Sequence, residues 1–149
     1  MPEDTKASLG KLEAAIEKIN KGLPALPVSA KEWIVKATPW IIVILSILLI
    51  PAIIAIFGLG AMFGSLSIMA GYSYGAVYYI VWALSLVTFI MELSAVKGLI
   101  ARKKSAWNIL FYVALINAVS SLIQVNIVSM LISTAISLYI LFQIRSYYK

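Results

Sequence analysis

Long apolar stretches fill most of this chain. Residues 37–91 and 105–144 contain no charged side chain, and both stretches are continuous in Leu, Ile, Val and Ala rather than alternating with polar residues. One membrane-spanning helix needs about 20 apolar residues, so each stretch is long enough for two crossings. A backbone in lipid must satisfy its own hydrogen bonds, and the absence of a two-residue alternation favours helices over a β-barrel. The pattern therefore predicts an all-α integral membrane protein with four transmembrane helices.

Local signals place the four crossings at about residues 39–57, 74–98, 105–123 and 127–144. Pro39 suits the first turn of the first helix with Thr38 as its N-cap, and Pro51 is expected to kink that helix. Aromatic residues open the second helix and cations close it, as interfacial anchors do. The polar turn at residues 124–126 is short, so the last two helices should form an antiparallel hairpin. Residues 31–149 are thus predicted to form a four-helix transmembrane domain.

Residues 58–73, between the first two predicted crossings, are rich in Gly and carry no charge. We predict either a loop or a half-inserted segment here. A half-inserted segment could be re-entrant and line a path through the membrane. Two GxxxG spacings occur in and just after the segment, and this motif lets helices approach closely. The glycines predicted to support helix packing are Gly60, Gly64, Gly71 and Gly75.

Residues 1–30 have a different pattern, with apolar residues recurring at intervals of three and four. This spacing is typical of an amphipathic helix, here followed by a Pro-containing linker. The helix should contact an oligomer partner or an interface through Leu9, Leu12, Ile16, Ile19 and Leu23. Its charges nearly cancel, so attraction to anionic lipid should be weak. Three destinations remain open for the apolar stripe: the membrane surface or the protein's own cytoplasmic face, a second protomer, or another protein.

Positive charges lie at one set of helix ends. Lys31 and Lys36 precede the first helix, residues 102–104 join the second to the third, and residues 145–149 follow the fourth. Cytoplasmic loops of membrane proteins carry an excess of Lys and Arg. An even number of crossings brings all these cations to one side. We therefore predict a protein of the bacterial inner (cytoplasmic) membrane with both termini in the cytoplasm, its N-terminus lacking the features of a signal peptide.

Composition narrows the functional classes. The 149 residues are 62% hydrophobic and 12% charged and include no Cys and no His, so thiolate and imidazole metal sites are excluded. The chain offers no paired acid and base, no activated nucleophile and no phosphate-binding Gly loop with a Lys. We therefore expect no enzyme, metal site or cofactor. The net charge of +6 does not require nucleic acid as a partner, because the later cations flank apolar helices.

Polar residues also occur inside the predicted spans. Ser129, Ser133 and Ser137 recur every four residues on one side of the fourth helix, where small residues permit close helix contact. An amide that faced lipid would be costly, so the polar side of the third helix should face protein or water. That side carries Asn117, Ser120, Ser121 and Gln124. These residues either hold helices together or line a hydrophilic path for a solute.

Glu92 is the only acidic residue after Glu32. It precedes Arg102 by ten residues, or about 15 Å along a helix, which places it within the membrane near the cytoplasmic side. Three interpretations remain open. Glu92 could form an ion pair with Lys97, Arg102 or Arg145 that fixes helix packing, bind a proton or cation, or remain an unpaired interfacial acid.

A resemblance to known proteins is carried by three segments: KGLPALPVSAKEWIVKATPW at 21–40, GLIARKKSAW at 98–107 and LFQIRSYYK at 141–149. Together they resemble a group of small, uncharacterised four-helix membrane proteins from bacteria with reduced genomes. Some members of that group are labelled chromate-transporter-like. The resemblance covers most of the chain and implies the four-helix architecture, whereas the predicted spans contain no cationic oxyanion site that would support the label.

Small-residue stripes and short polar loops favour association between copies of so small a bundle. We therefore predict a non-catalytic multipass protein of the lipid bilayer that forms a homo-oligomer and serves as an assembly or scaffold component. The alternative is a channel or transporter subunit for a small solute or ion. Its path would be lined by Asn117, Gln124, the serines of the fourth helix and Glu92.

Overall fold

The chain folds entirely into helices over the part that the structure describes. The computed structural model describes the backbone of residues 3–71 and 74–149, and the side chains among them except those of residues 3–7, 56–57, 61, 64, 67–68, 74–76 and 78. The helices are α1 (Glu3–Lys21), α2 (Val28–Met69), α3 (Tyr74–Ile100), α4 (Lys104–Ile123) and α5 (Ile127–Ile144), followed by the 3₁₀ helix η1 (Arg145–Tyr147). Within these residues four helices, α2 to α5, are long and apolar enough to cross a membrane. The protein therefore has the all-α, four-span architecture that the sequence predicts.

The first predicted crossing differs most from the structure. Helix α2 begins at Val28 and continues to Met69, so the loop predicted for 58–73 is wrong over 58–69. A Gly inside a helix costs only about 1 kcal/mol relative to Ala, whereas a backbone in lipid depends on its internal hydrogen bonds. The chain turns only after Met69, where Gly71 has a φ of 81°, a left-handed conformation that favours Gly. Entry of this segment into the membrane stays a prediction.

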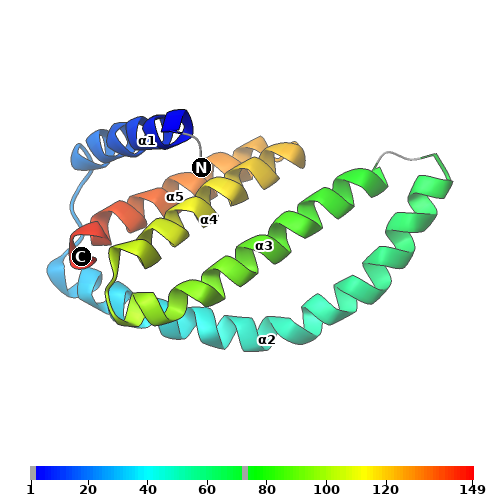
Figure 1. The fold of residues 1–149 in the computed structure, drawn as a ribbon, viewed down its shortest axis with the longest axis horizontal. Coiled ribbons are helices and arrows are strands. Elements are labelled where there is room, and N and C mark those ends of the chain that lie inside the picture. The colour runs from blue at the N-terminus through cyan, green and yellow to red at the C-terminus, as the bar shows by residue number, and fades with distance from the viewer. Residues whose placement is uncertain (1–2, 72–73) are drawn as a thin grey trace.

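Both prolines of α2 lie within the helix rather than at its start. Thr38, predicted as the N-cap, donates its hydroxyl hydrogen to the carbonyl of Ile34 at 2.7 Å. Pro51 lies within the apolar part of α2, and Figure 1 shows that α2 is bent along its length. A bend is the expected response to Pro, which removes one helix hydrogen bond and clashes with the preceding turn.

The helices converge at one end and spread apart at the other (Figure 1). We call the first the packed end: there α2 begins, α3 ends, α4 begins and α5 ends. We call the second the open end: there α2 reaches Met69, and residues 124–126 join α4 to α5. Each spanning helix packs against its neighbours in the sequence, and α5 also contacts α1 and α2. Most residues of α2 between 41 and 69 whose side chains are described are exposed, which suits contact with lipid.

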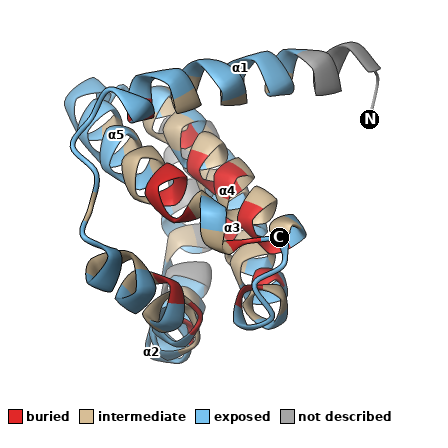
Figure 2. Ribbon diagram, turned by 90° about the vertical axis from the view of Figure 1, so that its left-hand side faces the viewer, coloured by how far each residue is buried: buried red, intermediate tan, exposed pale blue. Residues whose placement is uncertain are grey.

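The hydrophobic core lies at the packed end and is centred on Trp107. This side chain is 0% exposed, and its Nε1 donates to the carbonyl of Leu141 at 2.8 Å. Its ring stacks on Phe111 at 5.7 Å and meets the edge of Phe142 at 5.3 Å. Figure 2 shows buried residues gathered on α4 and on the end of α5 nearest the C-terminus. The contacts of Trp107 with Leu141 and Phe142 therefore hold α4 against α5.

A close contact between α3 and α4 depends on two small residues. A Cβ atom added at Gly98 would lie 2.7 Å from the Cβ of Ala106, much nearer than two carbon atoms can approach. The predicted GxxxG glycines behave differently where they are described: Gly71 lies in the turn after α2, and a Cβ there would meet nothing within 4 Å. The side-chain positions of Gly64 and Gly75 lie outside the described residues. Gly98, which the sequence analysis did not single out, is thus a glycine at a tight helix contact.

The C-terminal residues pair with the α3–α4 turn. Lys104 donates its backbone N–H to the carbonyl of Lys149 at 2.7 Å, and Lys149 donates to the carbonyl of Arg102 at 2.9 Å. Arg102 has a φ of 53° in this turn. This pairing joins the end of the chain to the start of α4.

Helix α1 crosses over the end of α5, on the side of the bundle away from α2 (Figures 1 and 2). Its contact with α5 is largely polar: Arg145 forms ion pairs with Glu13 and Glu17, and Gln143 Nε2 donates to Asn20 Oδ1 at 3.1 Å. The linker is held as well, because the Tyr139 hydroxyl donates to the carbonyl of Pro24 at 2.6 Å.

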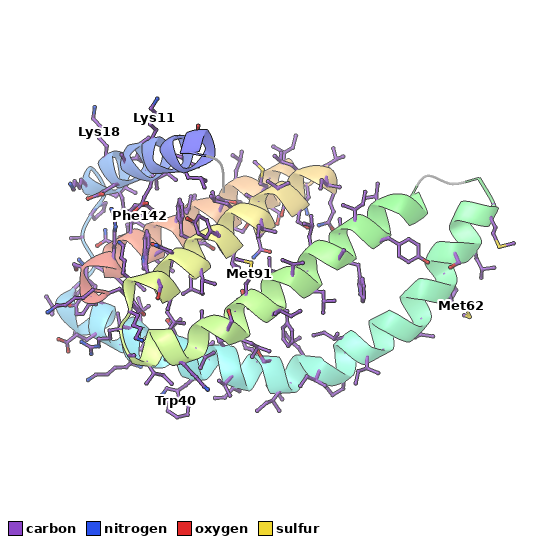
Figure 3. The ribbon with its side chains drawn as sticks, in the orientation of Figure 1. Lys11, Lys18, Trp40, Met62, Met91 and Phe142 are labelled. Atoms are coloured by element: carbon purple, nitrogen blue, oxygen red, sulfur yellow. The ribbon has the colours of Figure 1, made fainter. Side chains whose placement is uncertain are left out.

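The predicted apolar stripe of α1 is divided rather than buried as a unit. Ile16 packs against the core and Leu9 is half-buried, whereas Leu12, Ile19 and Leu23 are 42%, 68% and 45% exposed. Lys11 and Lys18 point away from the bundle (Figure 3). The helix itself is present, and its role as an amphipathic contact with the membrane or with another protomer stays a prediction.

Candidate functional site

Glu92 is one of two acidic side chains in the helices that are long enough to cross a membrane; the other, Glu32, lies near the start of α2. Glu92 lies on α3 within the span Tyr79–Ile100, and eight residues separate it from the end of α3, which is about 12 Å along the helix axis. The side chain is half-buried. Among the described residues, no side chain forms an ion pair or hydrogen bond with it.

The ion pair that the sequence suggested for Glu92 is not formed within the described part of the chain. Arg145 instead pairs with Glu13 and Glu17 of α1, and Arg102 is exposed in the α3–α4 turn. The physical reason is that α1 folds back over the end of α5 and brings two carboxylates to Arg145. The sequence spacing that placed Arg145 near Glu92 could not account for this long-range contact.

A first cavity extends from Glu92 toward the open end. Its volume is about 460 Å³, and residues of α2, α3 and the α4–α5 turn line it. The polar side chains in its lining are those of Trp82, Ser85, Thr88, Glu92 and Gln124. Ser85 and Thr88 donate their hydroxyl hydrogens to carbonyls of their own helix, both at 2.9 Å. Their oxygen lone pairs remain available, because a hydroxyl has two acceptor sites in addition to its hydrogen.

A second cavity extends from Glu92 toward the packed end. It has a volume of about 270 Å³ and lies among α2, α3, α4 and α5. Its polar side chains are those of Thr38, Glu92, Asn117 and Ser137. The Asn117 amide forms no hydrogen bond with another described side chain or with the described backbone. This cavity therefore presents free amide and carboxylate groups inside the membrane-spanning layer.

Glu92 lines both cavities and so lies where they meet. Val81 and Gln124 mark the part of the first cavity nearest the open end, and Thr38 and Ile144 mark the part of the second nearest the packed end. Figure 3 shows Met91, the neighbour of Glu92, in the middle of the bundle, whereas Trp40 points away from it. Glu92 thus contributes to the lining of both cavities, and each of them contains several other polar side chains.

The structure brings together some of the predicted polar residues and separates others. Asn117 and Ser137 join Glu92 in the second cavity, and Gln124 joins it in the first. Ser121 is half-buried, and Gln124 also donates to the carbonyl of Ser120 at 3.2 Å. The residues that lie away from both cavities are Arg102, Arg145, Ser129 and Ser133.

Sequence reasoning missed Thr38, Ser85 and Thr88 as part of this site. The last two had a detectable signal, because Ser85, Thr88 and Glu92 follow one another at intervals of three and four and so share one face of α3. Thr38 had no such signal, since its presence in the same lining as Glu92 depends on how α2 packs against α3 and α4.

The chemistry of the site is that of oxygen ligands. Carboxylate, hydroxyl and amide oxygens suit a proton or a hard cation, and within the described residues no group of three or more His, Cys, Asp or Glu side chains gathers to hold a metal ion. Comparison of the chain with known protein families, with curated proteins and with solved structures finds no match. The function must therefore be argued from the site itself.

Proposed function

We propose that this multipass membrane protein is a transport or channel subunit that moves protons or a small monovalent cation, with Glu92 as the binding group. The observation that carries the proposal is that Glu92 lines two cavities that also contain hydroxyl and amide groups, and that it has no ion-pair partner among the described residues. A carboxylate inside a membrane is costly unless it is paired, protonated or bound to a cation. Proton or cation binding would remove that cost.

In this proposal the two cavities would form the route on either side of Glu92. With the cation-rich helix ends in the cytoplasm, the second cavity would face the cytoplasmic side and the first the opposite side. Hydroxyl and amide groups spaced along a path can replace part of the hydration shell of a moving cation, or hold the water that carries a proton. Ser85, Thr88 and Gln124 would serve in the first cavity, and Thr38, Asn117 and Ser137 in the second.

An oxyanion is a poor fit to the same route. The described linings of both cavities include Glu92 and contain no Lys or Arg, whereas anion paths use rings of cations. The chromate-transporter-like label attached to some of the resembling proteins therefore gains no support from this site. A cation or a proton is the charge that Glu92 would attract.

A second candidate function is self-association as an assembly component. The observation that supports this role is an exposed stripe on α5, formed by Ser129, Ser133 and Ser137. Small residues of this kind allow close contact with another membrane helix. The two proposals are compatible, because Ser137 belongs both to this stripe and to the lining of the second cavity, so a second copy packed on α5 would cover part of that cavity. Mass measurement in lipid nanodiscs tests this role: a monomer at all protein concentrations would contradict it.

The transport proposal is tested by ion flux into liposomes that contain the purified protein and a trapped dye, either pH-sensitive or potassium-sensitive. We expect wild-type protein to dissipate an imposed proton or potassium gradient, and Glu92→Gln to slow the flux by at least about tenfold, because the neutral amide removes the binding charge. Glu32→Gln is the matched control: it removes an exposed carboxylate near the start of α2 and should leave the flux unchanged.

Two results would overturn the transport proposal. Flux no faster than in empty liposomes for both gradients would remove the activity, and equal flux for wild type and Glu92→Gln would remove the role of the carboxylate. Gel filtration of each variant in detergent shows whether its fold and assembly are intact. Unchanged flux with lost assembly would instead favour the scaffold role.

A further inference from the structure

A third cavity lies at the packed end, away from Glu92. Its volume is about 500 Å³, and it is lined by residues from the end of α1, the start of α4 and the end of α5 with η1. The charged residues in its lining are Glu17, Lys21, Lys104 and Arg145. Cations from three separate elements therefore converge on one hollow, although they are far apart in the sequence.

The cations of this cavity are not equally engaged. Lys21 pairs with Glu17 at 3.1 Å, and Arg145 pairs with Glu13 and Glu17. Lys104 Nζ lies over the Trp107 ring at 4.2 Å and forms no ion pair with a described residue. Three cations against two carboxylates leave an excess of positive charge, and Lys104 is the cation that remains available to an anion.

A buried tyrosine, Tyr148, also contributes to the lining. Tyr148 is 4% exposed, and its hydroxyl has no hydrogen-bond partner among the described residues. Burial raises the pKa of the Tyr148 phenol, an effect that the charge of Arg102 partly offsets, so the hydroxyl keeps its hydrogen at neutral pH. An unpaired hydroxyl in such a place costs free energy unless a ligand or water accepts its hydrogen bond.

The position of the cavity indicates where its ligand comes from. Lys104 begins the apolar helix α4, and Arg145 directly follows the last residue of α5, so both lie where the spans end. Phosphate groups of phospholipids lie at this boundary, and basic pockets between transmembrane helices on the cytoplasmic side bind anionic headgroups. Phe142 supplies apolar lining on the side of the core.

We propose that this cavity binds a phosphate group, presented by the headgroup of an anionic phospholipid. The Lys104 ammonium would neutralise a phosphate oxygen, the Arg145 guanidinium would share its donors between phosphate and the α1 carboxylates, and the Tyr148 hydroxyl would donate to the phosphate. Charge-assisted hydrogen bonds of this kind are stronger than neutral ones. The site is separate from Glu92, so its test does not depend on transport.

Native mass spectrometry of the delipidated full chain, with phosphatidylglycerol or phosphatidylcholine added back, tests the proposal. We expect phosphatidylglycerol to bind about fivefold more tightly than phosphatidylcholine, the scale that one cation near an anionic headgroup provides. Lys104→Gln should remove this preference. Lys103→Gln is the matched control, because it removes the neighbouring charge at an exposed residue that does not line the cavity.

A second variant guards against a folding defect in Lys104→Gln. Tyr148→Phe keeps the buried ring and removes only the unpartnered hydroxyl, so it should weaken phosphatidylglycerol binding several-fold while the melting temperature stays within a few degrees of wild type. Inorganic phosphate is tested as a third ligand, beside the two lipids. Displacement of the lipid by millimolar phosphate supports a phosphate site, whereas binding of inorganic phosphate without phosphatidylglycerol preference would overturn the lipid source.

Two results would overturn the site itself. Equal losses in Lys103→Gln and Lys104→Gln would show diffuse attraction of anionic lipid to a basic surface. Equal binding of phosphatidylglycerol and phosphatidylcholine to wild type, with no effect of inorganic phosphate, would show that the cavity does not recognise phosphate charge.

Discussion

The contact between Gly98 and Ala106 gives the sharpest test of how the packed end is built. In Gly98→Ala the new Cβ would lie 2.7 Å from the Ala106 Cβ, so α3 and α4 must move apart beside the buried Trp107. Overpacking of this kind costs about 1 to 3 kcal/mol. The better helix propensity of Ala returns about 1 kcal/mol, so we expect a net loss of up to about 2 kcal/mol in the free energy of unfolding.

A double-mutant cycle separates the clash from helix propensity. Ala106→Gly alone should destabilise the protein by about 1 kcal/mol, yet it removes the methyl group that the new Cβ would strike. Gly98→Ala with Ala106→Gly should therefore be more stable than the sum of the single changes predicts, by about 1 to 3 kcal/mol. Propensity terms cancel in this comparison, so the coupling energy reports the contact itself.

Reversible unfolding in mixed detergent micelles, followed by circular dichroism, measures these free energies. Gly58→Ala is the matched control, because a Cβ there meets nothing within 4 Å, and it should be neutral or slightly stabilising. A Gly98→Ala variant as stable as Gly58→Ala, or a coupling energy below about 0.5 kcal/mol, would refute the close approach of α3 and α4.

Two further predictions concern α1 and the threading of the chain. A hydrogen bond from Lys21, together with the charge of Arg145, lowers the pKa of Glu17 below its ordinary value of 4.5. The contribution of Glu17 to the docking of α1 is therefore complete above that value and is lost as the pH falls through the lowered pKa. Hydrogen exchange of α1 should accelerate in that acidic range, and Arg145→Gln should produce the same acceleration at neutral pH; exchange that stays slow in both cases would contradict the docking. The chain has no Cys, so a single introduced Cys can report the orientation. A Cys at Ala70 should react with an impermeant maleimide from outside intact cells, whereas a Cys at Ser146 should react only after permeabilisation. The reverse result would contradict the predicted orientation.

Much of the secondary structure could be predicted because it depends on local properties. Helices predicted at 74–98, 105–123 and 127–144 correspond to α3, α4 and α5 within two residues, since runs of apolar residues and the short polar turns between them are visible along the chain. The first crossing was misjudged because local propensity treats Gly and Pro as breaks. In α2, continuous backbone hydrogen bonding outweighs those costs, and the helix passes through Pro39, Pro51 and the Gly-rich segment.

The sequence by itself determined that this protein is helical and apolar enough to cross a membrane, because hydropathy and backbone hydrogen bonding act residue by residue. It also identified Glu92, Asn117, Ser137 and Gln124 as polar groups within the spans. Only the tertiary structure decided their partners: α1 supplies the carboxylates that Arg145 binds, and Glu92 is left at the junction of two cavities. Contacts between residues more than a hundred positions apart depend on how whole helices pack, and no local pattern along the chain records that packing.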